Sequence, residues 1–194
     1  MKNLKEIHSD LIIGAFKLTK NQLDSKGNRV IGWGRGKKEE EKNIIHQKVG
    51  LELELKVLDK YGDNEWIGMN NSKGEWNVAY HGVAYNKTSD QVKKITGLIY
   101  TSSFKTGPRQ QYRDYNDKNH KGKKVGIGVY CTPLIEEAES YARVSEINGN
   151  NYKTVLMVRV KPDSVRCPEG IENYWVVNGT TEEIRPYRIL FKKV

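Results

Sequence analysis

The chain has 194 residues, which is enough for one sizeable hydrophobic core with a small extension. Hydrophobic residues make up 37% of it, and no run approaches the roughly 20 apolar residues that a membrane span requires. The opening sequence, MKNLKEIHSD, lacks the apolar core of a secretory signal. We therefore expect no contact with a membrane and a cytoplasmic location, with the nucleus as the alternative.

The chain is basic, with 33 Lys and Arg against 24 Asp and Glu and a formal net charge of +9. Such an excess favours an anionic partner, such as a nucleic acid, an acidic protein or a dinucleotide. The alternative is a charge that serves only solubility, because the excess is spread along the chain. Cys131 and Cys167 form no CxxC pair, and the four histidines show no metal-ligand spacing, so no metal site is predicted.

The N-terminal part, residues 1–75, is expected to be an extension of a main domain. Residues 1–48 look loosely structured, because the turn-rich segment GWGRG at 32–36 is followed by a run of charged residues. Apolar and polar residues then alternate, and this period of two predicts a half-buried strand at about 49–58. We expect this strand to pack on the main domain.

The main domain, residues 76–194, begins with a predicted strand from Trp76 to Gly82 that ends in a glycine turn. Ser89–Ile95 predicts a short helix. The polar segment from Phe104 to Lys124 shows little periodicity, and long loops of this kind are often functional.

A second strand and a helix are predicted after this loop. The strand runs from Val125 to Cys131 and contains two glycines. Thr132 would cap the helix, with Pro133 at its first helical position, because these residue types favour those places.

Three further strands are predicted toward the C-terminus, at Tyr152–Val160, Tyr174–Val177 and Tyr187–Val194. Alternation in the middle strand directs Val176 to the core, with Trp175 and Val177 on the opposite face. The last strand would begin after Arg185-Pro186. The order of strands and short helices predicts an α+β fold with a mainly antiparallel sheet.

Three motifs together resemble the catalytic domain of the poly(ADP-ribose) polymerase branch of ADP-ribosyltransferases. They are Tyr80-His81-Gly82, then Gly128-Val129-Tyr130 with Tyr141 eleven positions after Tyr130, then Asn173–Val177. That family has a first strand ending in His-Gly, a Gly-Ile/Val-Tyr strand before a helix, and the same tyrosine spacing. The resemblance covers 76–194 and implies an ADP-ribosyltransferase-like mixed, mainly antiparallel split sheet with a few short helices.

A closer resemblance is to a set of uncharacterised eukaryotic proteins that share YHGV, GVYCTP and YWVVNGTTEEIRPYRILFK. It supports the same domain and implies nothing about activity.

The resemblance implies a cleft that uses NAD as a substrate and needs no metal. Gly82 would present its backbone amide and carbonyl to the nicotinamide carboxamide, because glycine lets the backbone come close. Tyr130 and Tyr141 would sandwich the nicotinamide ring, and His81 would hydrogen-bond the adenosine ribose. The alternatives are a plain turn glycine, two tyrosines packed on each other in the core, and a structural histidine.

The loop from Lys105 to Lys124 has seven basic residues and two acidic ones. In the family the corresponding loop lies over the dinucleotide. Arg109 and Arg113 are the better candidates to bind the pyrophosphate, because a guanidinium binds phosphate oxygens in pairs. The alternative is a solvated charged loop.

Two positions depart from the family pattern. Asn173 stands where many relatives have the catalytic Glu, whose charge stabilises the cation that develops on the ribose. An amide can still hydrogen-bond but carries no charge. In the family the chain-extending polymerases keep this Glu and several mono-transferases lack it, so the resemblance implies no polymer synthesis. The neighbouring Glu172 would point to the other face, because side chains alternate along a strand, unless a bulge re-aims it. Ala138 stands where the family often has a Ser that bonds the carboxamide.

These observations predict a mono-ADP-ribosyltransferase that acts on a protein or nucleic-acid acceptor, with His81, Tyr130 and Asn173 as its catalytic residues. The alternative is a catalytically inactive module that binds NAD, ADP-ribose or a protein partner through the same cleft. An RNA 2′-phosphotransferase on the same fold ranks last, because its cluster of basic catalytic residues cannot be placed on these strands.

Overall fold

The computed structural model describes residues 23–33, 48–68, 72–83, 104, 128–147, 149–167 and 170–194, with the backbone alone for 23–33 and 48–50. In the described part the fold is strand-rich, with antiparallel sheets and one α-helix, and is broadly α+β as predicted. The elements are β1 (Leu23–Trp33), β2 (Lys48–Leu55), η2 (Glu65–Ile67), β3 (Asn77–Gly82), β4 (Val129–Cys131), α3 (Ile135–Tyr141), β5 (Val144–Ile147), β6 (Asn150–Val160), η4 (Pro162–Ser164), β7 (Trp175–Val177) and β8 (Ile184–Lys193).

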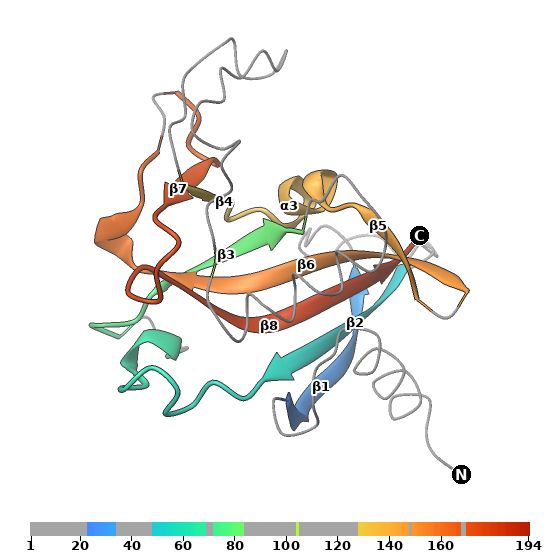
Figure 1. Cartoon of the computed structure of the whole chain (residues 1–194), viewed down its shortest axis with the longest axis horizontal. Coiled ribbons are helices and arrows are strands. Elements are labelled where there is room, and N and C mark those ends of the chain that lie inside the picture. The colour runs from blue at the N-terminus through green and yellow to red at the C-terminus, as the bar shows by residue number, and fades with distance from the viewer. Residues whose placement is uncertain are drawn as a thin grey trace, which may run out of the picture.

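The main sheet has the strand order β1-β2-β8-β6-β3, and β5 pairs with β6 (Figure 1). All of its pairs are antiparallel, so β8 is a central strand between β2 and β6. One row across the sheet consists of Leu53, Ile189, Leu156 and His81, each opposite the next. The first three of these side chains are buried, so this row directs His81 to the core face of β3.

The second sheet consists of β4 and β7 alone, with Tyr130 opposite Val176. Figure 1 shows this pair beside the main sheet. Its connection to β3 is a bridge between Tyr80 and Thr132, whose backbone groups exchange hydrogen bonds of 2.8 and 3.0 Å. On the other side of β7, Arg166 pairs with Val176.

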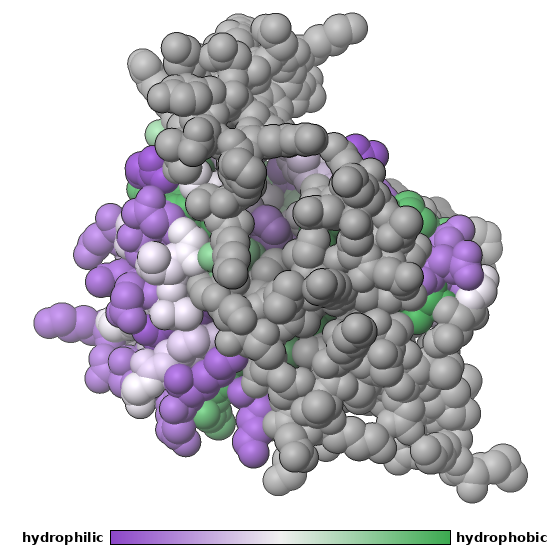
Figure 2. Space-filling view, in the orientation of Figure 1, coloured by the Kyte–Doolittle hydropathy of each residue, from purple (hydrophilic) through white to green (hydrophobic). Residues whose placement is uncertain are grey.

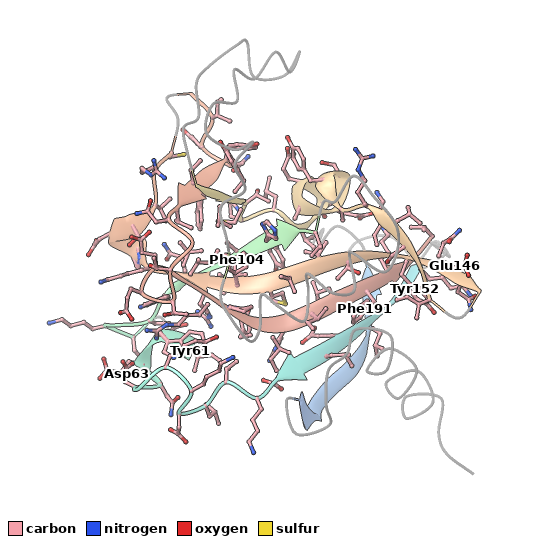
Figure 3. The ribbon with its side chains drawn as sticks, in the orientation of Figure 1. Tyr61, Asp63, Phe104, Glu146, Tyr152 and Phe191 are labelled. Carbon is pink, nitrogen blue, oxygen red and sulfur yellow. The ribbon has the colours of Figure 1, made fainter. Side chains whose placement is uncertain are left out.

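The two faces of the main sheet are covered differently. The main core on one face includes the fully buried Trp66, Leu53 and Phe191, of which Phe191 is labelled in Figure 3. Each such side chain contributes about 1.5–3 kcal/mol by leaving water. On the other face, Ala138 of α3 and Ala142, the residue that caps its C-terminus, pack with residues of β6 and β8. On the side of the molecule that Figure 2 shows, most of the described residues at the surface are hydrophilic.

An ion pair also holds α3 on the sheet. The Nζ atom of Lys192 in β8 lies 2.5 and 2.6 Å from the two carboxylate oxygens of Glu139. Lys192 is buried and Glu139 is half-buried, so the pair is sheltered from solvent screening. It fixes the helix that carries Tyr141.

Two strands were not predicted. β1 occupies part of the segment expected to be loosely structured, and it pairs with β2 from Leu23 to Trp33. Its register shifts between Asp24 and Arg29, so the apolar residues do not alternate regularly and the period-two signal is lost. β5 has only four residues, which is too short for a clear pattern. β2 lies in the same sheet as β8, and the domain boundary at residue 75 stays a prediction.

The start of the helix was predicted two residues too early. α3 begins at Ile135, with Leu134 as its N-cap. The backbone of Thr132 is engaged in the bridge to Tyr80, and its Oγ1 accepts a hydrogen bond of 3.1 Å from the Leu134 amide. Thr132 and Pro133 therefore lead from the sheet into the helix instead of forming its first turn.

The start of β8 was predicted too late, because the strand includes Arg185 and Pro186. Pro186 lies opposite Val158 at a register shift, and β2 pairs with β8 only from Arg188 onward. A proline can occupy this place because it has no ladder partner on the β2 side. The helix predicted at Ser89–Ile95 and most of the loop at 104–124 lie outside the described residues.

Neighbouring residues of β7 point to opposite faces, as predicted. The prediction that Val176 is the one facing the main core was wrong. Val176 and Val177 are both fully buried. Val177 belongs to the main core, with Trp175 packed against it, whereas Val176 packs with tyrosines on the opposite face. No helix in the described part of the chain is long and apolar enough to cross a membrane.

Candidate functional site

The edge of β3 that faces away from β6 carries the backbone groups of Gly82. Val83 donates a hydrogen bond of 3.1 Å to Thr154 of β6, so the odd-numbered residues of β3 bond toward β6. Tyr80 bonds in the opposite direction, to Thr132. Gly82 is even-numbered like Tyr80, so its amide and carbonyl also point away from β6. Neither group has a hydrogen-bond partner among the described residues. The site therefore offers a backbone donor and acceptor next to α3.

Close packing explains why position 82 is a glycine. A Cβ atom there would overlap the carbonyl oxygen of Ala138 and would lie 3.0 Å from the amide nitrogen of Ala142. The described glycines with positive φ do not include Gly82, so a left-handed turn is not the reason for this residue. Ala138 lies in this contact and is 2% exposed, which leaves little room for a larger side chain.

His81 connects β3 to β4. Its Nδ1 atom lies 2.7 Å from the carbonyl oxygen of Tyr130. A carbonyl can only accept, so Nδ1 carries the proton and Nε2 of the neutral ring is left as an acceptor. Burial lowers the pKa of His81, and this hydrogen bond opposes the shift only in part. The ring also meets Phe104 edge-on, with 5.2 Å between centroids (Figure 3).

Three tyrosines form one cluster on the outer face of the second sheet. The Tyr174 ring lies 5.3 Å from that of Tyr130 and 6.4 Å from that of Tyr141, measured between centroids. Tyr174 is buried, whereas Tyr130 and Tyr141 are half-buried, and Val176 and Ile171 complete the cluster. Sequence reasoning missed Tyr174 as a member of the site. A flat ligand held by Tyr130 and Tyr141 has to lie against Tyr174 as well.

A depression of about 380 Å³ lies next to the tyrosine cluster. Its lining residues are Glu137, Gly170, Ile171, Glu172, Asn173 and Tyr174. Tyr174 belongs to both the depression and the cluster. Glu137 precedes Tyr141 by one helical turn, so both side chains lie on the same side of α3. The expected third position of the site, Asn173, therefore lies within reach of this helix face.

The segment before β7 is a turn, and this corrects the expected placement of Glu172. The amide of Tyr174 donates a hydrogen bond of 3.1 Å to the carbonyl of Ile171, and β7 begins only at Trp175. Glu172 and Asn173 are thus the central residues of a turn, where strand alternation does not apply. Both are exposed and both line the depression. Sequence reasoning had placed them on opposite faces.

Two side chains hold the carbonyl oxygen of Glu172. The indole Nε1 of Trp175 donates to it at 3.0 Å, and the Sγ of Cys167 lies 3.3 Å from it. The turn signal that was overlooked is Gly170, which has φ of 73° and precedes this segment.

Other reactive residues stand apart from this arrangement. Burial raises the pKa of the Cys131 thiol to about 12, so this thiol stays protonated and is a poor nucleophile. Within the described ranges, no group of three or more His, Cys, Asp or Glu residues could hold a metal ion. Arg109 and Arg113 lie outside the described residues.

The chain matches no model of a protein family and no curated protein. Only the arrangement of residues in this chain therefore indicates a function. His81 bonds the carbonyl of Tyr130, and Gly82 packs against α3. The rings of Tyr130 and Tyr141 both pack on Tyr174. Asn173 and Tyr174 line the depression, which His81, Gly82, Tyr130 and Tyr141 do not line.

Proposed function

We propose that the protein is a mono-ADP-ribosyltransferase that uses NAD and modifies a protein or nucleic-acid acceptor. The observation that carries the proposal is the meeting of β3, β4 and α3. There the His81–Tyr130 hydrogen bond joins β3 to β4, and Gly82 packs against α3, the helix that carries Tyr141. The presence of a second, smaller sheet beside the main one supports an ADP-ribosyltransferase-like split sheet.

Each residue has a defined role in this proposal. The amide and carbonyl of Gly82 bind the nicotinamide carboxamide, and the rings of Tyr130 and Tyr141 hold the nicotinamide. The Nε2 atom of His81 accepts a hydrogen bond from a hydroxyl of the adenosine ribose. Arg109 and Arg113 bind the pyrophosphate.

The reaction breaks the bond between C1′ of the ribose and the ring nitrogen of nicotinamide. The electron pair of that bond leaves with nicotinamide, and positive charge develops on the ribose. An oxygen or nitrogen atom of the acceptor, or of water, forms the new bond to C1′ and releases its proton to solvent. The site accelerates the reaction only through contacts that are stronger in this charged transition state.

A second candidate is a non-catalytic module that binds NAD, ADP-ribose or a protein through the same cleft. Two observations favour it. Asn173 is neutral where charge would assist the reaction, and Tyr174 already contacts both Tyr130 and Tyr141.

The two candidates are separated by incubating the protein with labelled NAD and acceptors. Released nicotinamide is quantified, and mass spectrometry identifies any ADP-ribose on the protein, added peptides or nucleic acid. An enzyme releases nicotinamide and leaves one unit on the acceptor. A module shows a thermal shift with NAD or ADP-ribose but no release.

Tyr141→Ala should abolish both the thermal shift and any release. Tyr61→Ala is the matched control, since Tyr61 is also half-buried but packs on Trp66, away from the site. Ligand at a hundredfold excess over Kd stabilises by about 2.7 kcal/mol, which is easily measured. Neither a shift nor release at millimolar NAD, together with no shift by ADP-ribose, would reject the transferase and the nucleotide-binding module.

A further inference from the structure

Glu172 brings a carboxylate to the depression beside the tyrosine cluster. Its neighbour is Asn173, the position where the sequence lacks the charge expected from the resemblance. Asn173 and Glu172 are adjacent residues of one turn, and both line this depression. A strand would have separated them, but the bond from the Tyr174 amide to the Ile171 carbonyl closes the turn before β7 begins.

We propose that Glu172, and not Asn173, supplies the negative charge that stabilises the ribose cation in this site. The inference rests on the proposed transferase function. Glu172 directly precedes Asn173 and is two residues from Tyr174, which contacts the rings of Tyr130 and Tyr141. Its carboxylate therefore enters the site from the same turn as the expected third residue.

The backbone of Glu172 is fixed in a way that suits this role. Its carbonyl accepts the 3.0 Å hydrogen bond from Trp175 Nε1 and lies 3.3 Å from Cys167 Sγ. Trp175 is itself anchored in β7, opposite Cys131. These contacts hold the backbone of the turn, so the position from which the Glu172 side chain extends is set before the reaction starts, which favours a preorganised site.

Glu137 is the competing carboxylate, because it also lines the depression and comes from α3. Its position in the chain is one helical turn before Tyr141. The turn residue is favoured because Glu172 occupies the segment of the third site position, whereas Glu137 lies on the helix that carries the ring of Tyr141. Substitution of each residue decides between them.

The decisive measurement is steady-state nicotinamide release from NAD by the full chain and three variants. Glu172→Gln should lower kcat by roughly 100-fold, as removal of one transition-state contact does, with the KM for NAD nearly unchanged. Glu136→Gln is the control, because Glu136 is an exposed neighbour on α3 that does not line the depression. It should match the wild type. A large loss in Glu137→Gln with little loss in Glu172→Gln would overturn the assignment.

A rescue variant tests whether the loss in Glu172→Gln comes from the missing charge at this turn or from a folding defect. In Glu172→Gln with Asn173→Glu, the carboxylate returns to the same turn one residue later, and kcat should recover at least in part. An active wild type whose rate is unaffected by Glu172→Gln would reject this inference and leave the transferase function standing. A wild type that binds NAD and releases no nicotinamide would reject both.

Discussion

One hydrogen bond, between His81 Nδ1 and the carbonyl oxygen of Tyr130, joins the end of β3 to β4 over 2.7 Å. The two residues belong to different sheets, so this bond helps to fix one sheet relative to the other. His81 therefore has the structural role that was the alternative to binding the adenosine ribose. The bond also orients the ring, because it holds the proton on Nδ1 and leaves Nε2 to accept.

The first prediction concerns pH. Burial lowers the pKa of His81 below its value in the unfolded chain, so the unfolded chain binds the proton more readily than the folded one. The contribution of neutral His81 to stability is complete above the unfolded value of about 6.5 and is lost as the pH falls through the folded pKa.

Urea unfolding of the wild type and His81→Asn between about pH 5 and about pH 8 checks this, because histidine titrates in that window. The asparagine amide can still donate to Tyr130 but does not titrate. The free energy of unfolding should fall more steeply with acidification in the wild type than in the variant. Parallel pH profiles would show that His81 titrates alike in both states.

The second prediction concerns the contact between β3 and α3. Gly82→Ala places a methyl group on the Ala138 carbonyl, so α3 has to move. We expect a loss of about 1–3 kcal/mol in the free energy of unfolding, as is usual for overpacking. Asn77→Ala, at the exposed start of the same strand, should change stability by no more than about 0.5 kcal/mol. Equal stability of Gly82→Ala and wild type would contradict the packing of α3 on β3.

The third prediction distinguishes the two thiols. Cys167 is exposed, whereas Cys131 is buried and its pKa is raised to about 12. A thiol reagent near neutral pH should label Cys167 in the folded protein and reach Cys131 only after denaturation. Cys167→Ser should abolish labelling of the folded protein, and Cys131→Ser should leave it intact. Rapid labelling of both thiols under native conditions would show that β4 is not packed as described.

The strands predicted correctly are those in which local pattern and burial agree. In β2, Leu51, Leu53 and Leu55 are buried in the main core, as their alternation predicted. β6 combines β-branched residues with burial from Thr154 to Val160, where Met157 alone is half-buried. β1 escaped prediction because its bulge breaks the alternation, and its place in the sheet is fixed by pairing with β2. Such long-range pairing leaves no local signal.

The candidate site could be predicted only in part. The motif spacing singled out His81, Gly82, Tyr130 and Tyr141. The structure places His81 against the Tyr130 carbonyl, Gly82 against α3 and both tyrosine rings on Tyr174, and their roles stay predictions. The contact of Tyr174 with two other rings depends on tertiary packing, so no local pattern indicates it. The turn that directs Glu172 into the depression was missed because the segment was assigned to the strand that follows it.

The last prediction uses Val176 and Val177, neighbours in β7 that are both fully buried on opposite faces. Each Val→Ala change should cost about 1–3 kcal/mol of stability, because a buried side chain of this size loses apolar contact. Their effects on the site should differ, since Val176 packs against Tyr174 and Val177 packs in the main core.

The NAD-induced thermal shift and the near-ultraviolet circular dichroism of the tyrosines report this difference. Val176→Ala should change the tyrosine signal and weaken the shift, because the cluster loses its packing support. Val177→Ala should lower the melting temperature by a similar amount and keep both site readouts. Equal loss of the NAD shift in the two variants would mean that global stability controls binding. A preserved shift in Val176→Ala would instead remove the tyrosine cluster from the proposed site, because NAD would then bind without the support that Val176 gives to Tyr174.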